Sequence, residues 1–144
     1  MKNWKQPPAK QAVEKEILHF FRLLSSGKLE EAKARVLHHS DDWDHQIWSL
    51  WTETYLIVLE ELDQEVDDES FEGRGWQTDL RWLKALGIDQ SFHWDEMGSH
   101  VSPEGEHLFV HVTYEGELTD VTADFRVILE NGEFTLQRQI IHVA

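Results

Sequence analysis

Apolar residues in the first part of the chain recur with the spacing of a helix, which predicts four helical segments. The first segment opens at Pro7-Pro8 and ends at Gly27, where a glycine cap is typical. A short second helix is expected over Leu29–His38, and a third over about 41–62 with Ser40 or Asp41 as its cap. The fourth is expected over Thr78–Leu86. The apolar face of the first helix consists of Val13, Ile17, Phe20, Phe21 and Leu24.

From residue 90 onward, apolar and polar residues alternate with a period of two, which predicts strands. Asn131-Gly132 between two alternating runs is a strong hairpin signal, and Glu115-Gly116 marks a second turn. The two turns predict a three-stranded antiparallel meander over His107–Val143, with a further strand over Ser91–His100. The expected pairs on its apolar face are Leu108–Ala123, Val110–Val121, Phe125–Arg138, Ala123–Ile140 and Val121–His142. On its polar face we expect His107–Asp124 and His111–Asp120.

Helices followed by a sheet define an α+β fold, in which N-terminal helices pack on a C-terminal antiparallel sheet. At 144 residues, the chain is expected to form a single domain spanning 1–144. Two passages, Ile17–Val36 and Thr122–Val143, make the sequence resemble the nuclear-transport-factor-like superfamily, also called SnoaL-like or cystatin-like. The resemblance implies a sheet that wraps a long helix around a conical pocket. That superfamily usually has a strand among its helices, and the pattern shows none before residue 90.

The charge distribution narrows the classes of function. The chain has 28 Asp and Glu against 13 Lys and Arg, a formal net charge of −15. Such a surplus argues against nucleic acid as a partner, because phosphates require a basic surface. Cysteine is absent, which excludes thiolate metal sites and cysteine nucleophiles. No apolar stretch has the length of a membrane span or a signal peptide, so we expect no membrane contact and a cytoplasmic location.

The acids are concentrated in one half of the chain. Residues 1–36 carry a sum of +4, and residues 37–144 carry −19. The run Glu60–Glu69 contains seven acids in ten residues, which is typical of a solvated surface and also suits docking to a cationic partner. The first hypothesis is therefore a non-catalytic protein that binds a basic protein. Among relatives of the resembling fold, the immunity proteins that neutralise basic toxins match best. The expected contact residues are Asp63, Glu65, Asp67, Asp68 and Glu69.

The alternative hypothesis is a pocket protein, or an isomerase-like or dehydratase-like enzyme, that acts on a small apolar carboxylate. Its candidate residues are Arg138, His142 and Tyr114, the polar side chains expected on the apolar sheet face, where Arg138 would hold the carboxylate. The competing interpretation pairs Arg138 with an acid from a helix and places His142 and Tyr114 at the ends of the sheet.

The sequence leaves catalysis open and favours a protein that is not an enzyme. Isomerases and dehydratases of the resembling superfamily need a base inside the cone, whereas Asp120 and Asp124 are expected on the polar face. No catalytic residue is assigned. No cofactor or metal is expected, since helix capping accounts for the acids in the His38–His45 segment better than metal binding does. A homodimer through the exposed sheet face is a further expectation, with Phe109, Ile128 and Ile141 in the contact.

Overall fold

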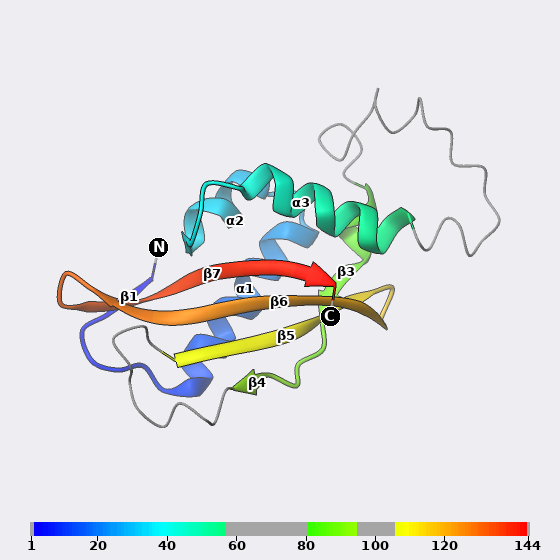
Figure 1. The fold of residues 1–144 in the computed structure, drawn as a ribbon. Helices are drawn as coiled ribbons and strands as arrows, with labels where there is room; N and C mark the ends of the chain where they lie inside the picture. The colour runs from blue at the N-terminus through cyan, green and yellow to red at the C-terminus, as the bar shows by residue number, and fades with distance from the viewer. Residues whose placement is uncertain (1, 57–80, 95–105, 144) are drawn as a thin grey trace.

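The computed structural model describes residues 2–56, 81–94 and 106–143. Within these ranges the chain forms the helices α1 (Lys10–Ser25), α2 (Leu29–Arg35) and α3 (Trp43–Trp51). A π-helical turn, η1 (Thr52–Leu56), extends α3, and a 3-10 turn, η2 (Arg81–Ala85), comes later. The strands are β1 (Asn3–Trp4), β2 (Leu37–His38), β3 (Leu86–Ile88), β4 (His93–Trp94), β5 (Glu106–Tyr114), β6 (Glu117–Glu130) and β7 (Glu133–Val143). The fold is α+β, as the sequence predicts (Figure 1).

The strands of the described residues form one sheet with the order β1-β7-β6-β5-β3. β2 also pairs with β7, in the parallel sense, and β4 also pairs with β5. All pairs except β2 with β7 are antiparallel. The long strands β5, β6 and β7 are the predicted meander. Figure 1 shows α1 crossing one face of these strands and α3 running alongside β7. The sheet therefore has an inner, helix-covered face and an outer face.

The helices and the inner sheet face share one hydrophobic core. Phe20 and Phe21 of α1 meet Phe125 of β6 in edge-to-face contacts, with ring centroids 5.8 Å and 6.5 Å apart. Trp43 at the start of α3 contacts Phe20 at 6.0 Å. All five residues of the predicted apolar face of the first helix are buried. Gly27 has a φ of 77°, which confirms the predicted glycine cap.

Both predicted turns are present, and the register next to them is the expected one. Asn131 and Gly132 have φ of 54° and 80°, the left-handed conformation that a tight hairpin requires. Phe125 pairs with Arg138, as predicted. Farther from the turns the register shifts, because an irregularity interrupts each ladder: one between His111 and Thr113 of β5, the other opposite Asp124 of β6. The predicted pairs beyond these points are therefore wrong.

The two irregularities differ in their effect on the faces. On β5 the pairing moves by two residues, so that His111 lies opposite Thr122 and inner residues stay inner. On β7 the shift is one residue, so that Ala123 pairs with Ile141, where Ile140 was expected. A shift of one residue moves the following side chains to the other face. Ile141 is accordingly buried, and Ile140 is 45% exposed.

Three local expectations about the helices are corrected. The second helix ends at Arg35, and Leu37–His38 form the strand β2, which the sequence pattern does not reveal. Asp42, and neither Ser40 nor Asp41, precedes α3 as its cap residue. Gly87, which directly follows the predicted fourth helix, lies inside β3. A Cβ atom at this position would lie 2.9 Å from the Thr113 hydroxyl oxygen, so the glycine permits close approach of β3 and β5.

None of the helices among the described residues is long and apolar enough to cross a membrane. Residues 78–80 of the predicted fourth helix, and the ends of the third helix and of the 91–100 strand, lie outside the described residues. The described remainder of the fourth helix is not α-helical, because Arg81–Ala85 form the 3-10 turn η2 and Leu86 begins β3.

Candidate functional site

Arg138 of β7 is completely buried and points to the inner side of the sheet, where β2 and the start of α3 meet β7. Its guanidinium donates hydrogen bonds to four acceptors. Nε donates to Nδ1 of His38 at 2.8 Å, and Nη1 donates to the Gln139 carbonyl at 3.1 Å. Nη2 donates to the Ser40 carbonyl at 3.2 Å and to the Asp42 carboxylate at 2.6 Å. Both ends of the guanidinium are thus engaged by the protein itself.

His38 is held as a neutral imidazole by its two bonds. Nδ1 accepts from Arg138, so the proton resides on Nε2, which donates to the Lys33 carbonyl at 2.7 Å. Burial lowers the pKa of His38 below its ordinary value, and the charge of Arg138 lowers it further, against the effect of the Lys33 bond. For Asp42, burial favours a higher pKa, but the hydrogen bond and charge of Arg138 outweigh it, and the pKa is lowered. Arg138 and Asp42 therefore form an ion pair.

The same network satisfies the backbone at the irregularity in β7. Gln46 of α3 donates to the second Asp42 oxygen at 3.1 Å and accepts from the Ile141 amide at 2.6 Å. The Gln139 carbonyl is satisfied by Arg138. Buried backbone groups need such partners where a ladder is interrupted. The cluster of Arg138, His38, Asp42 and Gln46 thus holds β7, β2 and α3 together, and Arg138 pairs with a helix-cap acid as the competing interpretation supposed.

The three pocket candidates do not lie together. Tyr114 is buried at the end of β5, opposite Glu117 and Leu86. Arg138 lies opposite Phe125, which pairs with Leu108, six residues before Tyr114 on β5. At about 3.3 Å per residue, that separation is about 20 Å along the sheet.

The placement of His142 on the same face as Arg138 is wrong. The one-residue shift on β7 turns His142 to the outer face, where its Nε2 lies 3.2 Å from the Thr122 hydroxyl. The sequence carries no local signal for this irregularity, because its stabilising partner Gln46 lies far away in the chain.

The outer face carries one carboxylate with two histidines against it and two further histidines on the neighbouring strands. Asp124 of β6 lies between His107 of β5 and His142 of β7, with Nε2 to carboxylate oxygen distances of 3.5 Å and 3.4 Å. Beside them, His93 of β4 stacks on Phe109 with ring centroids 4.8 Å apart and an interplanar angle of 10°. The ring of His111 contacts His93 edge-on at 5.2 Å. The sequence predicts His107 directly opposite Asp124, but the register places Arg126 opposite His107, so the contact between His107 and Asp124 is diagonal. The rest of the cluster is not predicted.

The contacts of His142 do not form a nucleophilic triad. Thr122 and Asp124 both approach the same ring nitrogen, Nε2. A triad needs the carboxylate and the hydroxyl on different nitrogens of the imidazole, so that a proton can pass through the ring. Within the described ranges, no group of three His, Asp or Glu residues is arranged to hold a metal ion.

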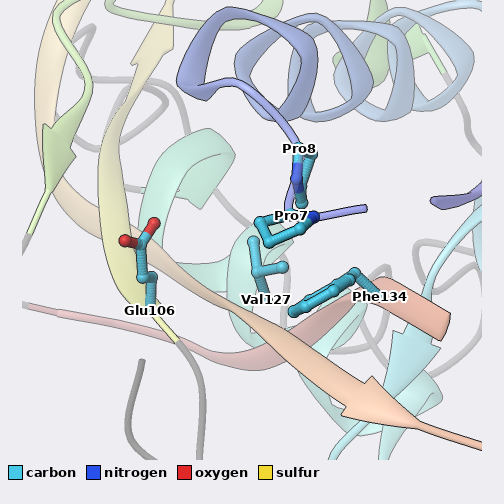
Figure 2. A pocket seen from close by; sticks show the side chains of 5 residues that line it. All are labelled: Pro7, Pro8, Glu106, Val127 and Phe134. Atoms are coloured by element: carbon cyan, nitrogen blue, oxygen red, sulfur yellow. The ribbon is translucent and has the colours of Figure 1, made fainter. Parts of the chain in front are cut away.

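A small hollow lies at the hairpin end of the sheet, under the N-terminal segment. Figure 2 shows Pro7 and Pro8 beside Val127 and Phe134, with Glu106 on the adjacent strand. Its volume is about 60 Å³, far below the roughly 300–1,000 Å³ of a typical ligand pocket. Neither Arg138 nor Tyr114 lines it. The hollow therefore does not suit the expected carboxylate ligand.

The acids expected to contact a partner lie outside the described residues: Asp63, Glu65, Asp67, Asp68 and Glu69. No protein-family model, curated protein or solved structure matches the chain.

Proposed function

We propose that this protein is a non-catalytic interaction protein that binds a basic protein through its acidic surface. The observation that carries the proposal is the net charge of −15, with −19 concentrated in residues 37–144. Such a field attracts a cationic partner and accelerates its association. An immunity protein that neutralises a basic toxin is the specific form of this proposal. The resemblance of Ile17–Val36 and Thr122–Val143 to the nuclear-transport-factor-like superfamily remains part of it.

The geometry of Arg138 favours this proposal over the alternative of a pocket protein or enzyme for a small carboxylate. Its guanidinium donates to His38, Gln139, Ser40 and Asp42. A ligand carboxylate would have to displace Asp42 and enter a site with no exposed guanidinium surface. Displacing a buried, hydrogen-bonded ion pair is costly. The alternative thus loses the residue on which it chiefly depends.

The test is capture of partners from source-cell lysate on the tagged protein, with washes at low and at high salt. We expect a basic protein that is retained at low salt and released at high salt, because salt screens surface charges. Reversal of three acids in the predicted contact, Asp63, Glu65 and Asp67, to lysine should weaken capture strongly.

The control variant reverses Glu30, Glu31 and Asp41, which are exposed acids on and after α2, away from the outer sheet face. This variant has the same net charge as the first, so it separates a local contact from a general effect of charge. Equal loss in both variants would contradict the 63–69 contact. Retention of no basic protein at either salt concentration would overturn the proposed function.

The homodimer through the outer sheet face also remains a proposal, with one change in its contact residues. Ile141 is buried on the inner face, and Ile140 lies exposed on the outer side in its place. The apolar contribution would come from Phe109, Ile128 and Ile140, so such a dimer would compete with any other partner for this face. Sedimentation equilibrium of the protein and of an Ile140→Asp variant tests this: a monomer at high concentration for both would refute it.

A further inference from the structure

The carboxylate of Asp124 occupies the centre of the outer sheet face and is weakly satisfied by its described neighbours. Its two contacts, to His107 and His142, are 3.5 Å and 3.4 Å long. Charge-assisted hydrogen bonds from nitrogen to a carboxylate are normally about 2.7–2.9 Å. The side chain is 19% exposed, so its oxygens remain accessible from solvent. This carboxylate therefore has acceptor capacity for a group that approaches from outside.

A stacked pair of rings lies next to this carboxylate, with Phe109 nearer to it than His93. Phe109 is the cross-strand neighbour of Asp124 in the β5–β6 register. His93, from β4, stacks on Phe109 nearly in parallel, and the His93 residue itself is exposed. The edge of His111 completes the group. A carboxylate beside a stack of planar rings is a combination that suits a planar cation.

We propose that the outer-face site formed by Asp124, His93 and Phe109 binds an arginine side chain of the basic partner. A guanidinium can donate two parallel bonds to a carboxylate while its face stacks on aromatic rings. A lysine ammonium offers neither the fork nor the flat face, so the site favours arginine. The partner class rests on the proposed function, whereas the arginine specificity rests on the geometry of this face.

The probe is N-acetyl-arginine amide, titrated into the full isotope-labelled chain and followed by amide chemical shifts. We expect saturable shifts centred on β4, β5 and β6. The corresponding lysine amide should bind more weakly. Asp124→Asn should lower the affinity for arginine about tenfold, as expected for loss of a charged acceptor.

Two further variants separate a specific site from a general effect. Asp120→Asn makes the same charge change at an exposed position on the same strand and should leave arginine binding unchanged. A Phe109→Leu variant removes the ring beside Asp124 and should reduce the preference for arginine over lysine. If Asp124→Asn perturbs the fold, seen as widespread shift changes without ligand, the Phe109 variant still tests the site.

Two results would overturn the inference: equal effects of Asp124→Asn and Asp120→Asn, or arginine binding no stronger than lysine binding. Salt-sensitive capture of a basic protein that is insensitive to Asp124→Asn would refute this site and leave the proposed function intact. Arginine binding at Asp124 without any captured basic protein would support the site and refute the proposed function.

Discussion

Replacement of Arg138 by methionine tests the role assigned to the buried polar cluster. The variant keeps an unbranched stem of similar length and removes the charge and all four donated bonds. His38, Ser40 and Gln139 then lose a donor, and Asp42 loses its ion-pair partner. The side chain of Arg138 is fully buried, so water cannot replace these bonds without opening the structure.

The expected loss of stability is worked from these contacts. Removal of one partner from a buried ion pair costs about 3–5 kcal/mol. Asp42 is 33% exposed on its side chain, which lets water solvate it and moves the cost towards the lower end. The acceptors in the interior, His38 among them, remain unpaired and add to it. We expect a decrease of about 3–4 kcal/mol in the free energy of unfolding, a large share of the 5–15 kcal/mol typical of a domain.

Urea unfolding followed by circular dichroism measures this quantity, with Arg35→Met as the matched control. Arg35 makes two bonds to Glu16, at 2.9 Å and 3.0 Å, and links α2 to α1. Its side chain is 33% exposed, so the control should lose only about 0.5–1 kcal/mol. A loss below about 1 kcal/mol for Arg138→Met, or equal losses for both variants, would refute the structural role.

Three further predictions concern His38, Gly87 and Gln46. The pKa of His38 is lowered in the folded state from its ordinary value of 6.5. Unfolding therefore takes up a proton when the pH is below that ordinary value, and the urea midpoint should fall as the pH decreases from 7 to 5. In a His38→Gln variant this part of the pH dependence should be smaller. Gly87→Ala should destabilise the fold by about 1–3 kcal/mol by pressing on Thr113, and Thr113→Ala should relieve most of that loss in a thermal melt. Gln46→Leu leaves the buried Ile141 amide without its acceptor and should cost about 1–3 kcal/mol in urea unfolding; an unchanged midpoint would contradict the assigned bond.

The parts of the fold that were predictable from sequence depend on local signals. Gly27, Asn131 and Gly132 adopt the left-handed conformation that their positions suggested, so the first helix and the last hairpin were correctly predicted. The predicted strand register is correct next to the two hairpin turns. It failed where the ladders are interrupted, because the group that satisfies the Ile141 amide comes from Gln46 on another element.

In the candidate site, too, the contacts between distant segments could not be predicted from the sequence. An acid partner for Arg138 was among the sequence interpretations, but Asp42 was expected only as a residue of a helix start. The strand β2 consists of two residues and is set by its pairing with β7, so it has no periodic pattern to detect. The outer-face cluster needs His93 from β4, which contacts β5 only through the tertiary fold. Contacts between distant segments are absent from single-sequence patterns.

The position of β7 in the sheet has a consequence for the order of folding. β7 lies between β6 on one side and the short strands β1 and β2 on the other. β1 and β2 leave the ribosome long before β7, so both remain unpaired until β7 has been synthesised. The sheet closes only when residues separated by about 130 positions meet, and such distant pairing is slow. Nascent chains that lack β7 would expose Leu37–His38 and the β6 edge, the surfaces on which a chaperone would act.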